Sequence, residues 1–295
     1  MFRIVFEGDP NKKTLWGVSL DTIFTVVTTI LIFILGYIIT KIIESRKEKR
    51  RLKEIEEYFI KTVQMMTKPI EKQKRGLLSF AKILKKNKEQ HLVLEDVSGI
   101  EIKQLREITS KDLFTIFVRN KKGEISFKTE LYGKLRSQLE YIEVVKKSLE
   151  GDLKSFLKYH EKFVSVYKEN LQQVNELLEE FISEKISSAE QPNSELFLFK
   201  VNRIRLAWIK KEDKEYTDMF VSFEKFVRPV QELCQKEQYD KIVSVIVKPI
   251  MGCVYAYHDI KELRWFYRRH FLVEAKGLQT SLFKINEALG DFEKM

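Results

Sequence analysis

Residues 20–43 read LDTIFTVVTTILIFILGYIITKII, and the longest uncharged run of the chain lies inside them, between Asp21 and Lys41. From Ile23 to Ile39, twelve of the seventeen residues are Ile, Leu, Val or Phe. On an insertion scale those twelve contribute about −5 kcal/mol. As a helix the whole stretch would be about 36 Å long, enough to cross a bilayer core of about 30 Å. The sequence therefore predicts a transmembrane helix here.

Polar residues in and beside this stretch fit the same interpretation. The hydroxyls of Thr25, Thr28 and Thr29 can bond to carbonyls of their own helix, and the rings of Trp16 and Tyr37 fall near headgroup level. A buried core helix and a cleaved signal peptide are the alternatives. The first would carry a polar interruption over this length. The second would have a basic start, a shorter apolar run and small residues at its end.

Basic residues flank the stretch unequally. Arg3, Lys12 and Lys13 precede its uncharged run, and seven basic residues follow that run: Lys41, Arg46, Lys47, Lys49, Arg50, Arg51 and Lys53. Because Lys and Arg concentrate on the cytoplasmic side, we expect an outer N-terminus and a cytoplasmic C-terminal part at the inner or plasma membrane. The seven residues after the stretch are also candidates to contact anionic lipids at the membrane surface.

The composition favours helices over strands. Of the 295 residues, 33% are charged and 44% are hydrophobic, whereas Gly and Pro number only 11 and 5. We therefore predict an all-α protein, with a single N-terminal transmembrane helix followed by an elongated cytoplasmic helical bundle of long amphipathic helices. The net charge of +10 is too spread out to indicate nucleic-acid binding. Cys234 and Cys253 are expected to be buried thiols rather than a disulfide.

The chain divides into five predicted parts. A short extracytoplasmic segment (1–19) and the transmembrane helix (20–43) are followed by a basic juxtamembrane and stalk helix (44–88). A helical domain (89–188) and an aromatic-rich C-terminal helical domain (194–295) complete the chain.

The stalk has apolar residues at steps of three and four from Leu52 to Ile70, which predicts one buried helical face. Pro69 lacks a backbone donor and disfavours helix at Lys68, so a kink or break is expected there. The pattern is less regular from about residue 87 to 129. A helix could open at Ser110, and Ile125 to Lys128 alternate like a strand, so a small hairpin and short helices both stay open.

Residues 130–186 form the longest periodic segment, about 80 Å if it is one helix. A helix of this length needs a packing partner, either within the chain or through coiled-coil self-association. Gly151 and Asp152 give the one central stop signal, so two antiparallel helices that meet at Gly151 are the alternative.

The C-terminal region is expected to hold a dense aromatic core. Its hydrophobic stretch from Ile242 to Tyr257 raises a second membrane span, but Lys248 and Pro249 interrupt it after six residues. Pro229 and Pro249, like Pro69, are interpreted as helix breaks.

The sequence carries no local catalytic or nucleotide-binding motif: GxxxxGK, GxGxxG, GxSxG and HExxH are all absent. No cofactor is expected. Three of the four histidines have a Glu four residues later, a spacing that places both side chains on one helical face. The pairs His258–Glu262 and His270–Glu274 are thus candidate metal ligands, although a charged pair without metal is the simpler interpretation.

The segment from Arg264 to His270 (RWFYRRH) resembles the Arg-x4-6-His element of HEPN-type ribonucleases. The resemblance implies that Arg264 would stabilise phosphate and that His270 would act in acid–base catalysis on RNA. A residue offset of six corresponds to about 240° around a helix, so the two side chains would not share one face. A site would need a local helix break or a dimer, and a purely structural role for both residues is the alternative.

Two functions follow from these observations. The favoured one is a membrane-anchored helical interaction or adaptor protein, more a binding protein than an enzyme. Its expected partners are the bilayer and a protein partner or a second copy, and not nucleic acid. The alternative is a membrane-tethered HEPN-like ribonuclease effector, of the kind that acts in phage defence.

Overall fold

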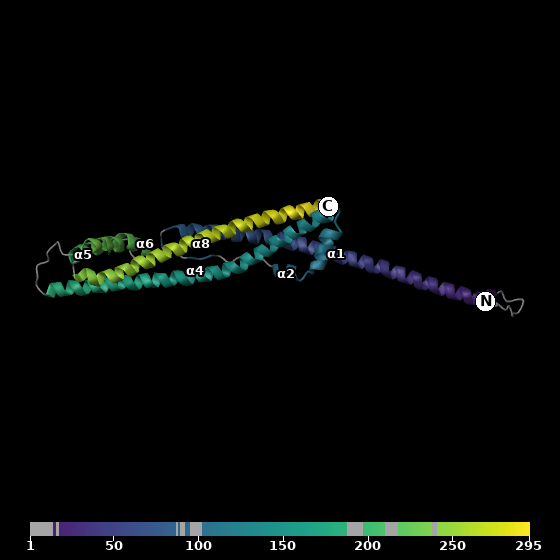
Figure 1. Cartoon of the computed structure of the whole chain (residues 1–295), viewed down its shortest axis with the longest axis horizontal. Helices are drawn as coiled ribbons and strands as arrows, with labels where there is room; N and C mark the ends of the chain where they lie inside the picture. Colours follow the sequence, from purple (N-terminus) through teal and green to yellow (C-terminus); the bar gives the residue numbers. More distant parts are fainter. Residues whose placement is uncertain are drawn as a thin grey trace, which may run out of the picture.

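The computed structural model describes residues 14–15, 18–86, 88, 92–94, 102–187, 197–209, 218–237 and 241–295 (Figure 1). These residues are almost entirely helical, which confirms the predicted fold class at that level. The exception is a small antiparallel pair of strands, β1 (Thr14–Leu15) and β2 (Val18–Ser19), directly before the first helix.

Helix α1 (Leu20–Lys85) contains both the apolar stretch and the stalk. It begins at Ser19, whose hydroxyl accepts a hydrogen bond from the Thr22 amide at 3.2 Å, and Asp21 in the first turn complements the helix dipole. The break expected at Pro69 is wrong, because α1 continues through it. Proline costs a helix about 3 kcal/mol. Burial of Met66 and Ile70 on either side of it offsets that cost.

Three short elements follow: α2 (Ile102–Arg106), α3 (Ser110–Phe114) and the π-helical turn η1 (Thr115–Arg119). Helix α3 begins at Ser110 as predicted, with the Thr109 hydroxyl accepting from the Asp112 amide at 3.1 Å. The hairpin alternative is wrong. Residues Ile125 to Lys128 form the first turn of α4 (Ile125–Ser187), and Gly123 reverses the chain before it with a φ of 110°.

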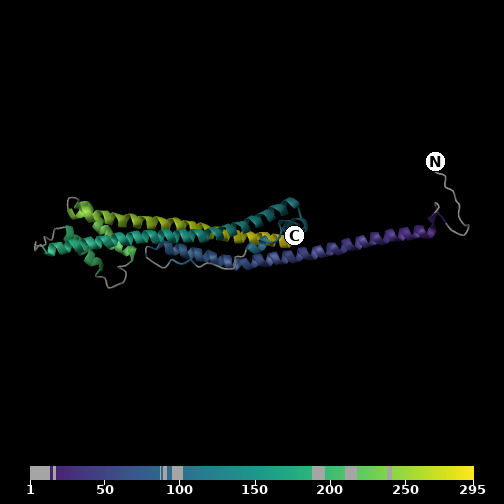
Figure 2. The ribbon, with the colours of Figure 1, turned by 90° about the horizontal axis from the view of Figure 1, so that it is seen from below.

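Helix α4 and α8 (Lys241–Lys294) pack against each other in opposite directions, and α1 packs along α8 (Figures 1 and 2). Helix α4 is continuous through Gly151, so the alternative of two helices that meet there is wrong. Helices α4 and α8 lie close to each other at Gly252 and Gly277, both of which belong to α8. An added Cβ at Gly277 would lie 1.9 Å from the Tyr141 hydroxyl.

The end of the α4–α8 pair far from the N-terminus is covered by α5 (Phe197–Ile209), α6 (Met219–Ser222), the π-helical turn η3 (Phe223–Val227) and α7 (Arg228–Lys236). Pro229 lies in the first turn of α7, where a missing amide costs little, and η3 runs directly into α7. Pro249 lies inside α8, between Ile246 and Ile250, which are both fully buried. Neither proline breaks its helix, contrary to expectation.

Two groups of buried apolar residues stabilise the helices. The proximal core joins the stalk part of α1, the first half of α4 and the second half of α8. The distal core joins the second half of α4, the first half of α8, α5, η3 and α7. Helices α4 and α8 contribute to both cores, so the packing crosses the predicted boundary between 89–188 and 194–295, and that division into domains stays a prediction.

Candidate functional site

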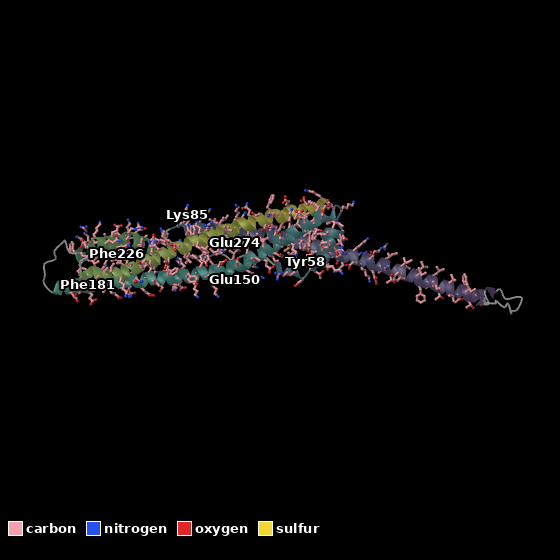
Figure 3. All side chains as sticks on the ribbon, viewed as in Figure 1. Tyr58, Lys85, Glu150, Phe181, Phe226 and Glu274 are labelled. Carbon is pink, nitrogen blue, oxygen red and sulfur yellow. The ribbon has the colours of Figure 1, made fainter. Side chains whose placement is uncertain are left out.

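The apolar part of α1 lies outside the packed helices. Almost every side chain from Asp21 to Arg50 is exposed, Phe24 and Phe33 at 73% and 75% (Figure 3). The helix is long and apolar enough to cross a membrane, and none of its most apolar window is buried. Thr25 and Thr29 donate their hydroxyls to the carbonyls of Asp21 and Thr25, each at 2.7 Å. These bonds satisfy the two hydroxyls within the helix, as expected for threonines in a lipid-facing segment.

The seven basic residues predicted to face the membrane surface all lie on α1 just beyond this apolar part, and all of them are exposed. The Lys41 ammonium lies 4.9 Å from the centre of the Tyr37 ring, at the boundary between the apolar part and the basic run. Their exposure leaves them accessible to lipid headgroups, so their role in lipid binding stays a prediction.

Arg51 holds α1 to α3. Its guanidinium donates two hydrogen bonds to Asp112, at 2.7 and 3.1 Å, and two to Glu48. These bonds hold the pKa of Asp112 below its ordinary value and raise the pKa of Arg51. Beside them, Lys121 pairs with Glu56 of α1 at 2.7 Å. The connection between α3 and α4 is thereby attached to α1 next to the basic run.

Arg264, the candidate phosphate-binding residue, is 4% exposed and is used inside the fold. Its guanidinium donates to the carbonyls of Ile83, Leu84 and Lys86, at 3.1, 3.3 and 2.8 Å. The last carbonyls of a helix lack partners within the helix and carry partial negative charge, so a buried cation suits them. Arg264 therefore caps the C-terminus of α1 from α8.

His270, the candidate acid–base residue, lies two turns further along α8 and faces α4. Its Nε2 is 3.0 Å from an Asp152 carboxylate oxygen. The unbroken helix points Arg264 and His270 at different neighbours, so one chain does not bring them together. Glu274, the predicted partner of His270, instead accepts a hydrogen bond from the Tyr141 hydroxyl at 3.3 Å.

The candidate metal ligands are not brought together either. His258 is exposed and contacts the rings of Phe223 and Tyr257 edge-on, and Glu262 is exposed one turn away. Among the described residues, no group of three or more His, Cys, Asp or Glu could hold a metal ion. His91, the histidine of the third predicted pair, lies outside the described residues.

His160 is a residue that the sequence reasoning missed. It packs against Phe156, and its Nε2 is buried without a hydrogen-bond partner among the described residues. Burial, together with the nearby charge of Arg264, lowers the pKa of His160 to about 4. A signal was present in the sequence, because His160 is the only histidine with no Glu four residues later. This difference indicates an apolar rather than an ion-paired environment.

The two cysteines are free and buried, as predicted. Burial raises the pKa of the Cys234 thiol to about 11 and that of Cys253 to about 12, so both are unreactive near neutral pH.

A cavity of about 420 Å³ opens beside α2, between Phe59, Tyr132 and Leu139. Its described lining combines apolar side chains with Ser110 and four charged residues, Arg106, Arg136, Glu140 and Glu143, and includes no histidine or cysteine.

Comparison of the chain with known proteins identifies no relative. No protein-family model matches the chain, and searches of curated proteins and of solved structures find no significant match.

Proposed function

We propose that the chain is a membrane-anchored interaction or adaptor protein. In this proposal α1 crosses the bilayer once near residues 20–43, and the helical body, defined as residues 52–295, is an elongated cytoplasmic bundle that presents its surface to a protein partner or to a second copy. The observation that carries it is the exposure of an apolar helical segment about 36 Å long, uncharged between Asp21 and Lys41 and continuous with a helix whose next part is buried on one face.

The exposed segment is more apolar than the surface of a soluble protein. Soluble monomers rarely expose a contiguous apolar patch larger than a few hundred Å². Here Val27, Ile30, Ile34 and Ile38 are exposed on successive turns, together with apolar neighbours all round the helix. A lipid core satisfies such a surface, because the backbone is fully hydrogen-bonded within the helix.

The helical body supports a binding role by its shape and rigidity. Helix α1 is tied to the other helices near both ends of its stalk, by Arg51 to Asp112 and by Arg264 to the carbonyls of α1. An anchored body of this kind holds its exposed faces at a fixed distance from the membrane.

Membrane anchoring is tested with the double variant Leu31→Arg/Ile34→Arg. Each arginine at the centre of a span costs about 3 kcal/mol on an insertion scale, which together outweighs the gain from the apolar residues. We expect the wild type to need detergent for extraction from alkali-washed membranes and the variant to be soluble without it. The matched control Leu31→Val/Ile34→Val should behave as wild type. Equal extraction of all three proteins would refute the anchor.

The adaptor role is tested separately by affinity purification of the full chain from detergent-solubilised membranes, followed by mass spectrometry and size analysis. We expect a reproducible protein partner or a self-oligomer. Recovery of neither would refute the interaction role and leave the anchor intact.

The orientation is tested by protease added to sealed right-side-out vesicles. The protease should spare the helical body, and digestion of the body from outside would reverse the proposed orientation.

A further inference from the structure

The end of the helical body nearest the exposed part of α1 is itself exposed, apolar and basic. It comprises residues 119–127, here called the proximal tip, which connect η1 to the first turn of α4. Ile125 and Phe127 are 67% and 49% exposed, and Arg119 and Lys122 are exposed beside them. Within the tip, Arg119, Lys121 and Lys122 outnumber Glu124, so its formal charge is positive.

The rigid packing of the helices fixes how far this tip lies from the proposed span. Phe80 of α1 packs edge-on against Phe156 of α4, with ring centroids 5.8 Å apart, and the two helices run in the same direction. Counting back 31 residues along each helix leads to Lys49 and Ile125. Ile125 is therefore level with Lys49, only about 9 Å along α1 from Ile43 at the end of the span.

The contacts of the tip hold it against α1. Lys121 pairs at 2.7 Å with Glu56 of α1, which lies about 20 Å along the helix from Ile43, and the Lys128 ammonium donates to the Lys121 carbonyl at 2.7 Å. The tip therefore extends from about the level of Glu56 to that of Lys49, with Ile125 at its end nearest the span. Figure 2 shows the first turns of α4 standing apart from α1 at this end of the body, level with the C-terminus. Ile125 and Phe127 therefore project at this end of the body, whereas Lys128 in the same turn is buried.

We propose that the proximal tip is a second contact with the bilayer, in which Ile125 and Phe127 enter the headgroup layer and Arg119 and Lys122 pair with anionic phospholipid. This inference rests on the proposed span. Headgroup regions extend about 5 to 8 Å beyond the hydrocarbon core, and screening at physiological salt acts over about 8 Å. Ile125, about 9 Å from the end of the span, is within reach of both, and a modest helix tilt shortens the gap for the rest of the tip.

The chemistry of the tip favours an anionic lipid surface over a protein partner. Aromatic and aliphatic side chains with basic neighbours are typical of segments that lie in the membrane interface. The basic run of α1 ends at Lys53, three residues before the Glu56 that Lys121 of the tip contacts, so the tip adds positive charge beside the end of that run. Glu124 and the carboxylates of Asp291 and Glu293 near the C-terminus moderate this charge, and Lys294 pairs with Asp291.

The test uses the full chain in lipid nanodiscs made of phosphatidylcholine, with or without phosphatidylglycerol. Single cysteines are introduced and labelled with an environment-sensitive fluorophore at position 125, at Met65 and at Phe33. The native Cys234 and Cys253 are buried and unreactive, so labelling is selective. Met65 is 76% exposed on α1 and lies about 33 Å beyond Ile43, which makes it the matched control in the body.

We expect headgroup-quencher lipids to quench most of the fluorescence at position 125 and almost none at position 65. Phosphatidylglycerol should increase the quenching at 125. Each removed basic side chain should shift the contact equilibrium about fivefold, so Arg119→Ser/Lys122→Ser should abolish most of that increase. Quenching from the bilayer core at position 33 reports the span independently.

Three outcomes would overturn the inference. If position 33 is quenched while position 125 behaves like position 65, the anchor holds and the tip does not touch lipid. If position 125 is protected from water without lipid quenching, a protein covers the tip. If quenching at 125 does not depend on phosphatidylglycerol or on Arg119 and Lys122, the contact is not with anionic lipid. Absence of quenching at position 33 would instead refute the span on which the inference depends.

Discussion

Residues 21–43 and 52–84 belong to the same helix, α1, yet they face different surroundings. In the first part the apolar side chains point in every direction and are exposed, Phe33 at 75%. In the second part most of them recur at steps of three and four and are buried, Phe80 at 1%. The difference teaches that the distribution of apolar residues around a helix, and not their number alone, identifies the surrounding medium. A stripe fits a protein partner, and a full apolar circumference fits lipid.

The largest effect on this comparison is expected from matched truncations of one phenylalanine in each part. Phe80 contacts the rings of Phe156 and Phe271, so Phe80→Ala leaves a cavity in the proximal core and should lower the free energy of unfolding by about 3–5 kcal/mol. Phe33→Ala touches no packed side chain and should leave it unchanged. Urea unfolding of the detergent-solubilised chain, followed by circular dichroism, measures both. Equal destabilisation would mean that residues 21–43 are packed against protein.

The next effect concerns the junction where α1 ends. Arg264→Met removes the donor to three carbonyls of α1 and leaves them in a buried site, which should cost about 2–4 kcal/mol. Arg264→Lys keeps the charge without the planar fork of donors and should lose less. Arg269→Met is the control on the same helix. Arg269 is exposed over the Trp265 ring, so its loss should cost no more than about 1 kcal/mol.

The comparison of Arg264→Met with Arg264→Lys tests the structural role of Arg264. A structural Arg264 predicts that stability falls with the number of carbonyl bonds removed, so that lysine lies between arginine and methionine. If Arg264→Met unfolds at the same urea concentration as wild type, the cap does not stabilise α1, and the structural role given to Arg264 is wrong.

Acid should weaken the body through His160. The folded pKa of about 4 lies below the ordinary 6.5, so the unfolded chain binds the proton more tightly. Stability from the neutral imidazole is therefore present above pH 6.5 and is lost as the pH falls toward 4. Between about pH 7 and about pH 5 the loss should be about 2 kcal/mol at most. Urea unfolding at both pH values should show a smaller loss for His160→Leu, and an equal loss in both proteins would exclude this histidine as the cause.

The sequence predicted the features that depend on local pattern. The apolar circumference of residues 20–43, the stripe of the stalk and the helix start at Ser110 all depend on neighbours within a few turns. Proline and glycine gave wrong helix boundaries because distant contacts outweigh local propensity. Pro69 and Pro249 lie between buried residues whose packing holds each helix together.

The candidate site could be predicted only in part, because its residues act across the fold. The basic run after the apolar stretch is visible in the sequence, but Arg51 and Asp112 are 61 residues apart, and Arg264 lies about 180 residues from the carbonyls that it binds. No periodicity encodes such pairings. Arg264 resembled a catalytic residue in sequence because a buried helix cap and a phosphate-binding site both use a cation with several donors.

The smallest expected effect compares the two glycines inside α1. At Gly76, an added Cβ would meet only a methyl carbon of Leu94, at 3.8 Å, an ordinary contact distance. Alanine restricts the unfolded chain more than glycine and favours helix by about 1 kcal/mol, so Gly76→Ala should raise the free energy of unfolding by about 0.5–1 kcal/mol. At Gly36, nothing of the protein lies within 4 Å, and the residue belongs to the proposed span. Gly36→Ala should therefore leave urea unfolding of the body unchanged, because the span does not unfold with it. If both substitutions raise the free energy of unfolding by the same amount, the two parts of α1 unfold as one unit. The change from an exposed to a buried apolar surface along α1 would then not separate two regions that unfold independently.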